Sequence, residues 1–258
     1  MSRTLRTLLL AALFLCSAES LAAQDPWRHV MTVELRAGRD ALSNGAAAWQ
    51  DQGASLRYSA STRAGLGVGA EQLQRFGRED RRATAELFIP LGRRVTVGVE
   101  GEASDTHVMV PRQGGAAQLN LALPAGWGLT ARGALRRYDD NDVRGGSAGI
   151  EKYLGNAMLS YSATAMQLAR LDPVVTHSAR YAYFFGDRGS FTVQGSVGTE
   201  VEALMATGPL VVPVRGVGAW GVIPVAPHLA LTWASDVSRH AGFFTRKRAQ
   251  VGVRVVSR

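Results

Sequence analysis

Strict alternation of apolar and polar residues is the feature that most constrains how this 258-residue chain can fold. In residues 83–102, ATAELFIPLGRRVTVGVEGE, apolar side chains occupy every second position on both sides of a Pro-Leu-Gly break. Charged side chains such as Glu86, Arg94 and Glu100 stand between them. Because successive side chains of a β-strand point to opposite faces, this stretch predicts two strands, each with one hydrocarbon face and one polar face.

The same period of two recurs along the chain, for example in residues 129–136, 191–198 and 250–255. No segment shows a convincing period of 3.6 residues, so helices are not expected. We predict about fourteen strands of the length that a tilted membrane-spanning strand requires, with twelve strands as the alternative. The predicted strands lie near residues 29–38, 52–60, 64–73, 81–90, 93–103, 115–123, 127–137, 143–154, 156–167, 176–185, 190–200, 210–222, 228–237 and 243–256.

The predicted connections alternate between short and long. The short ones, such as 91–92, 124–126 and 186–189, contain the Gly, Pro and Asp residues that hairpin turns favour. The longer ones lie at 39–51, 74–80, 104–114, 138–142, 168–175, 201–209 and 238–242. With an even number of strands, all long connections emerge at one end, as in outer-membrane barrels.

This pattern predicts an all-β transmembrane antiparallel up-and-down β-barrel in the outer membrane, with both termini in the periplasm. The alternative is a soluble secreted β-sandwich, which would also alternate. Its strands would be shorter, and the asymmetry of the connections would have no cause. Aromatic residues near both predicted ends are typical of the two interfacial girdles of a barrel. They are Tyr58, Trp127, Phe185 and Phe191 at the short-turn end, and Trp49, Phe76, Tyr138, Phe243 and Phe244 at the other.

The first residues indicate export. Arg3 and Arg6 precede an apolar run that is too short to span a bilayer, and small residues follow it, so residues 1–23 are predicted to be a cleaved signal peptide. Residues 24–258 then form the barrel domain, and Cys16 is lost with the leader. Without Arg3, Arg6 and Glu19, 27 basic residues stand against 20 acidic ones. Export makes nucleic acid an improbable partner, and no cofactor or metal is expected.

The polar face of the predicted strands carries charges of both signs. A closed barrel turns this face inward, because a guanidinium in the hydrocarbon would cost about 2–4 kcal/mol. We therefore expect a lumen lined by Glu34, Arg36, Arg57, Glu71, Glu86, Arg94, Glu100, Glu102, Arg132, Arg136, Glu151, Arg180, Glu200, Asp236 and Arg254. These charges either tune a conducting lumen or fill the interior with ion pairs.

Three stretches resemble the YaiO family of outer-membrane β-barrel proteins: YDDNDVRGGSAGIEKYLGNAMLSYS at 138–162, RFGRED at 75–80 and YFFGDRGSF at 183–191. The resemblance covers most of the chain and rests on a pattern of hairpins. It implies an integral outer-membrane barrel of unsettled biochemical role. For a barrel in that membrane, the partners that we expect are membrane lipid, lipopolysaccharide and the barrel assembly machinery. The oligomeric state stays open.

Three functions fit these observations. The first is a non-enzymatic channel or export conduit for polar solutes, and the second is a structural or surface-interaction barrel with a plugged lumen. The third is a hydrolase, in which Asp–His pairs activate water. Its candidates are Asp139, Asp140, Asp142, His107, His177 and His240, although aspartates also crowd into ordinary turns.

Basic residues also cluster near the predicted long connections. The outer leaflet there presents phosphorylated lipopolysaccharide, and arginine binds phosphate through two parallel hydrogen bonds. We therefore expect lipopolysaccharide contacts from Arg75, Arg78, Arg81, Arg82, Arg246, Lys247 and Arg248, with Arg136, Arg137 and Arg144 flanking another connection. The alternative is a solvated basic rim without a specific partner.

Overall fold

The computed structural model describes residues 29–75, 77–139, 141–168, 172–186, 188–204 and 208–257, and these are almost wholly β-structure. The predicted signal peptide, Phe76 and Asp140 lie outside the described residues. The strands are β1 (Val30–Leu42), β2 (Trp49–Ser59), β3 (Gly65–Arg75), β4 (Arg78–Leu91), β5 (Val95–Thr106), β6 (Gln113–Ala122), β7 (Trp127–Arg137), β8 (Asp142–Leu154), β9 (Ala157–Leu168), β10 (Val174–Phe185), β11 (Gly189–Leu204), β12 (Gly208–Ala226), β13 (Leu229–His240) and β14 (Phe244–Ser257), with one 3-10 turn, η1 (Pro124–Gly126), before β7. Within these ranges, no helix is long and apolar enough to cross a membrane.

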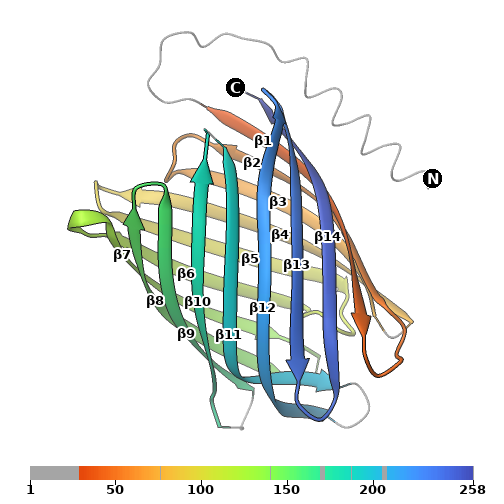
Figure 1. Ribbon diagram of the computed structural model, residues 1–258. Coiled ribbons are helices and arrows are strands. Elements are labelled where there is room, and N and C mark those ends of the chain that lie inside the picture. Colours follow the sequence, from red (N-terminus) through yellow and green to blue (C-terminus); the bar gives the residue numbers. More distant parts are fainter. Residues whose placement is uncertain are drawn as a thin grey trace.

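The fourteen strands form one closed antiparallel barrel (Figure 1). Each strand pairs with its neighbours in sequence, and β1 closes the barrel against β14 in a register that runs from Met31–Ser257 to Leu42–Arg246. This confirms the predicted fold class and fourteen strands rather than twelve. We call the end that holds Val30 and Ser257 the termini end, and the opposite end the loop end.

The two faces of the wall differ as the alternation predicts. On β4 and β5, Leu87, Ile89 and Val99 point outward and are 39–47% exposed, whereas Glu86 and Glu100 point into the barrel and form ion pairs there. The closed hydrogen-bond ladder leaves no free edge in the apolar band, which is the condition for a sheet to cross a bilayer.

The predicted contrast between short turns and long loops is wrong at three places. The connection expected at 74–80 shrinks to residues 76–77, that at 201–209 to residues 205–207, and that at 238–242 to residues 241–243. Polar residues continue the pairing beyond the apolar band, as in Arg75 opposite Arg78. Backbone hydrogen bonds do not require apolar side chains, so the strands extend past the membrane. Figure 1 shows that the loop-end part of the β11–β12 hairpin bends away from the direction of the rest of its two strands.

Candidate lumen site

A ladder of alternating charges crosses the inner wall from β1 to β7. We define the charge ladder as Arg36, Glu71, Arg82, Glu102 and Arg136. Glu71 pairs with both Arg36 (2.9 Å) and Arg82, and Glu102 pairs with Arg82 (2.8 Å) and Arg136 (2.7 Å). The Glu71 and Glu102 side chains are only 11% and 12% exposed. The arginines are 25–43% exposed, but removing one of them would leave a largely buried carboxylate without a partner, so the members of the ladder depend on one another.

Glycines make room for this ladder and for its neighbours. Gly114 on β6 lies between Glu102 on β5 and Arg136 on β7, and a Cβ there would be 2.7 Å from Glu102 Oε1. Gly67 on β3 has the same place between Arg57 and Glu86, with a Cβ again 2.7 Å from the carboxylate. An inward glycine thus lets a side chain pass over one strand to its partner on the next.

Further pairs continue along the wall. Arg57 lies 3.5 Å from Glu86, Arg132 pairs with Glu100, and Arg254 lies 2.7 Å from Glu34. Thr232 on β13 donates to Glu34 (3.2 Å), and Arg180 donates to Ser160 (3.2 Å). Glu200 and Asp236 line a cavity of about 250 Å³ between β11 and β14. The structure therefore places the predicted lumen charges on the interior side, and most of them are paired.

Near the loop end, four residues predicted for lipopolysaccharide contact face the interior instead. Arg248 lies 3.2 Å from Asp51 and Arg246 3.6 Å from Asp236, while both approach Asp40. Arg82 belongs to the charge ladder, and Arg75 lies over the ring of Trp49 (4.6 Å). The prediction is wrong for these four because the inward parity of their strands continues past the apolar band. Arg78, Arg81 and Lys247 are exposed, and Arg81 pairs with Glu79 at 3.0 Å.

The aromatic residues behave differently at the two ends. At the termini end, Trp127, Phe185 and Phe191 are outward and 38–43% exposed, as an interfacial girdle requires. At the loop end, Trp49 (4% exposed) and Phe244 (8% exposed) are buried on the inner side, with ring centroids 5.9 Å apart. The predicted second girdle is therefore wrong for these two, because their side chains narrow the lumen instead.

Two loop-end connections have residues held against the inner wall. Asp80 is fully buried and accepts hydrogen bonds from the backbone N–H groups of Val108 (3.1 Å), Met109 (2.6 Å) and Val110 (3.0 Å), which fixes the connection 107–112. Tyr138 follows β7, and burial beside the charge ladder raises the pKa of its phenol. Neither Asp80 nor the lumen acids Asp40 and Asp51 was predicted. Asp40 and Asp51 could have been predicted by continuing the inward-facing positions of the predicted strands 29–38 and 52–60 by one or two residues.

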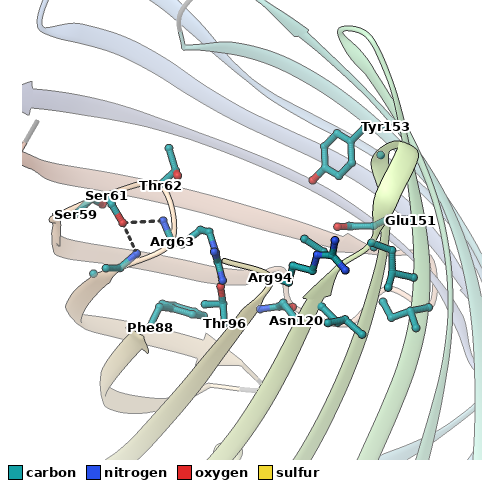
Figure 2. Close-up of a pocket in the computed structure, with 18 of the residues that line it drawn as sticks. Ser59, Ser61, Thr62, Arg63, Phe88, Arg94, Thr96, Asn120, Glu151 and Tyr153 are labelled. Carbon is teal, nitrogen blue, oxygen red and sulfur yellow. Dashed lines mark hydrogen bonds between the residues drawn. The ribbon is translucent and has the colours of Figure 1, made fainter. Parts of the chain in front are cut away.

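The termini end holds a larger space, a cavity of about 1260 Å³. Figure 2 shows Arg94 and Glu151 pointing into it among Asn120, Tyr153 and Ser59. Among the described residues, neither Arg94 nor Glu151 has an ion-pair partner within 4.0 Å. These two charges are thus open to a solute that enters the cavity.

Arg63 holds one wall of this cavity in place. Its guanidinium donates to Thr96 Oγ1 (2.8 Å) and to the carbonyl oxygens of Gly92 (3.1 Å), Arg93 (2.7 Å) and Val95. These bonds tie the turn between β2 and β3 to the turn between β4 and β5. Arg63 therefore acts as a structural clamp at the mouth.

Of the residues considered for hydrolysis, the described part of the chain brings together one Asp–His pair, and the others lie apart from it. His107 Nε2 lies 2.7 Å from Asp139 Oδ1, across two loop-end connections. His177 points outward and bonds Tyr161 Oη (2.7 Å), and His240 is buried against Phe244, with ring centroids 4.6 Å apart. Asp142 pairs with Arg137 on the outward face (3.4 Å). The described residues also contain no group of three or more His, Cys, Asp or Glu side chains that could hold a metal ion.

An apolar outer band, a polar paired lumen and a closed wall define a membrane-spanning β-barrel. The YaiO membrane beta barrel domain model matches residues 31–203, and the chain belongs to this family of outer-membrane barrels. Comparison with curated proteins gives no match.

Solved structures show the same fold at very low identity. One is described as a bacterial polysaccharide outer membrane secretin, with 9% identity, a TM-score of 0.52, and 88% of this chain and 98% of that chain covered. Another is the CymD monoaromatic hydrocarbon channel, with 8% identity, a TM-score of 0.59, and coverage of 89% and 88%.

Proposed function

We propose that this protein is a non-enzymatic conduit that passes small or linear polar solutes through a narrow lumen. The observation that carries the proposal is the cavity of about 1260 Å³ at the termini end, with Arg94 and Glu151 open to a solute. Arg57 also lines a second cavity of about 420 Å³ beside the charge ladder, so the two spaces adjoin. Fourteen strands enclose a lumen between the filled interior of eight-stranded barrels and the wide channel of sixteen-stranded porins.

The lining suggests the class of solute. Hydroxyl, amide and paired charged groups replace the hydration of a polar molecule without fixing its charge. Since guanidinium and carboxylate groups are paired nearly one for one, we expect weak ion selectivity. The two similar solved structures are described as handling a polysaccharide and monoaromatic hydrocarbons. That likeness concerns the fold alone, and the polar wall favours the first kind of solute over the second.

A plugged structural barrel is the second candidate. It is favoured by the buried side chains at the loop end, where Trp49, Phe244 and Val110 narrow the lumen. Purified protein in planar bilayers separates the two functions. The conduit gives reproducible conductance steps with a reversal potential near zero in a KCl gradient, whereas folded but silent protein supports the plugged barrel.

A matched pair of variants sharpens this experiment. Trp49→Ala removes a lumen side chain and should enlarge the conductance step of a conduit. Phe191→Ala removes an outward ring at the other end, 39% exposed and outside the lining of the cavity, and should leave the step unchanged. Heat-modifiable gel mobility checks that both variants are folded.

A further inference from the structure

The outward face of four adjacent strands carries cations that no described residue neutralises. Arg39, Lys247, Arg239 and Arg215, on β1, β14, β13 and β12, are exposed. None of them has an ion pair or side-chain hydrogen bond with any residue that the structure describes. The acidic side chains of these strands are Glu34, Asp40 and Asp236, and all three pair with arginines of the lumen instead. We call these four cations the basic stripe.

The strand registers bring the basic stripe together. Arg215 is directly opposite Arg239. On β13, the residue opposite Lys247 is Val237, and Arg239 is the next outward residue of that strand. On β1, the residue opposite Lys247 is Ala41, and Arg39 is the neighbouring outward residue. With strands about 4.8 Å apart, the four residues span roughly 14 Å of the wall. Like charges directly opposite each other on a sheet destabilise it, so this arrangement calls for an external anion.

The position of the basic stripe indicates which anion. Below Arg39 the outward residues of β1 are Met31, Val33, Leu35 and Ala37, and Val251 and Val253 continue this apolar surface on β14. Eight residues from Met31 to Arg39 rise about 21 Å along a strand tilted by about 40°, close to the height of the apolar band of such barrels. The stripe thus lies at the headgroup level of the leaflet at the loop end.

We propose that the basic stripe binds the phosphate groups of lipopolysaccharide. Arginine matches phosphate through two parallel hydrogen bonds, and an anion between Arg215 and Arg239 removes their repulsion. The proposal takes the loop end to face the outer leaflet. It does not depend on whether the lumen conducts, and its test does not measure conduction.

Other basic residues of the same rim provide a control. Arg81 is paired with Glu79 (3.0 Å) and Arg137 with Asp142 (3.4 Å), so these guanidinium groups already have anions. The test compares parent protein, Arg39→Gln/Arg215→Gln/Arg239→Gln/Lys247→Gln, the smaller Arg215→Gln/Arg239→Gln variant, and the control Arg81→Gln/Arg137→Gln. Each is purified in detergent, and its thermal unfolding midpoint is measured alone, with lipopolysaccharide, with dephosphorylated lipopolysaccharide and with phosphatidylglycerol.

The quadruple variant should be at least as stable as the parent without lipid, and less stable than the parent when lipopolysaccharide is present. Alone, the quadruple variant unfolds at the same temperature as the parent or higher, because repulsion is removed. Lipopolysaccharide raises the unfolding midpoint of parent and control equally. The rise is mostly lost in the quadruple variant and partly lost in the double variant. Dephosphorylated lipopolysaccharide raises the midpoint of the parent only a little. Equal stabilisation of parent and quadruple variant overturns the proposal. Equal stabilisation of the parent by phosphatidylglycerol also overturns it, since the stripe would then be an unspecific anionic-lipid surface.

Discussion

Gly114 shows how one missing side chain can hold two charges together. Its inward position gives the Glu102 side chain a path over β6 to Arg136. Gly115, the next residue, faces outward, and a Cβ there would meet only the Glu100 carbonyl oxygen at 3.5 Å, an ordinary contact. Two adjacent glycines of one strand thus differ in what an added methyl group would disturb.

We predict that Gly114→Ala lowers the free energy of unfolding, by about 1–3 kcal/mol as for overpacked cores, because Glu102 has to leave Arg136. Gly115→Ala should change it little. Urea unfolding of both variants in detergent micelles, followed by tryptophan fluorescence, makes the comparison. Equal midpoints for the two variants would show that Glu102 can reach Arg136 by another path.

The parity of the sequence predicts which face a residue occupies, but not its partner. Leu87, Ile89 and Val99 face outward as expected, and Glu86 and Glu100 face inward. The partner of Glu86, however, is Arg57 two strands away, and that pairing depends on register and on the glycine between them. The alternation of apolar and polar residues predicts neither the strand register nor the role of this glycine.

At the scale of elements, the fourteen strands were predictable and their ends were not. The apolar residues that make the period visible stop at the membrane boundary, while hydrogen-bonded pairing continues to Arg75, Arg246 and Arg248. The sequence therefore predicts loops where the structure has strand. Arg75, assigned to the connection 74–80, consequently faces the lumen over the ring of Trp49. Arg246 and Arg248, placed just below the last long connection, also face the lumen, where they approach Asp40.

The connection 107–112 depends on a single side chain of β4. We predict that Asp80→Ala loosens this connection, since three N–H groups lose their acceptor. The N–H of Val110 is buried, and leaving such a group unpaired costs about 1–3 kcal/mol. Limited proteolysis should then cut the variant within residues 107–112 at least several times faster than the parent.

Asp105→Ala is the control for this prediction. Among the described residues, the Asp105 carboxylate accepts only local bonds from Thr106, at 2.7 and 3.2 Å, and it is exposed. Its cleavage rate should stay near that of the parent. If Asp80→Ala resists protease as well as Asp105→Ala does, other contacts hold the connection.

For the whole molecule, the orientation in the membrane is the main prediction. We expect both termini in the periplasm and the loop end outside the cell. A short epitope inserted after Gly45, in the β1–β2 connection, should be labelled by antibody on intact cells. The same epitope after Gly155, between β8 and β9, should be labelled only after the outer membrane is permeabilised. Both glycines lie between paired strands and are kept, so the insertions interrupt no strand of the barrel. Labelling of both epitopes on intact cells would refute this orientation.

The seam between β1 and β14 has a consequence for how the protein is made. It joins residues that are more than two hundred positions apart, such as Glu34 and Arg254. Every other strand can pair as soon as its neighbour emerges, but this pair has to wait until the last strand exists. Until then the growing sheet has two unpaired edges, each a template for association with another chain. A long interval between the first hairpin and the last favours a chain that is guarded while it inserts, and it is here that the predicted dependence on the barrel assembly machinery would act.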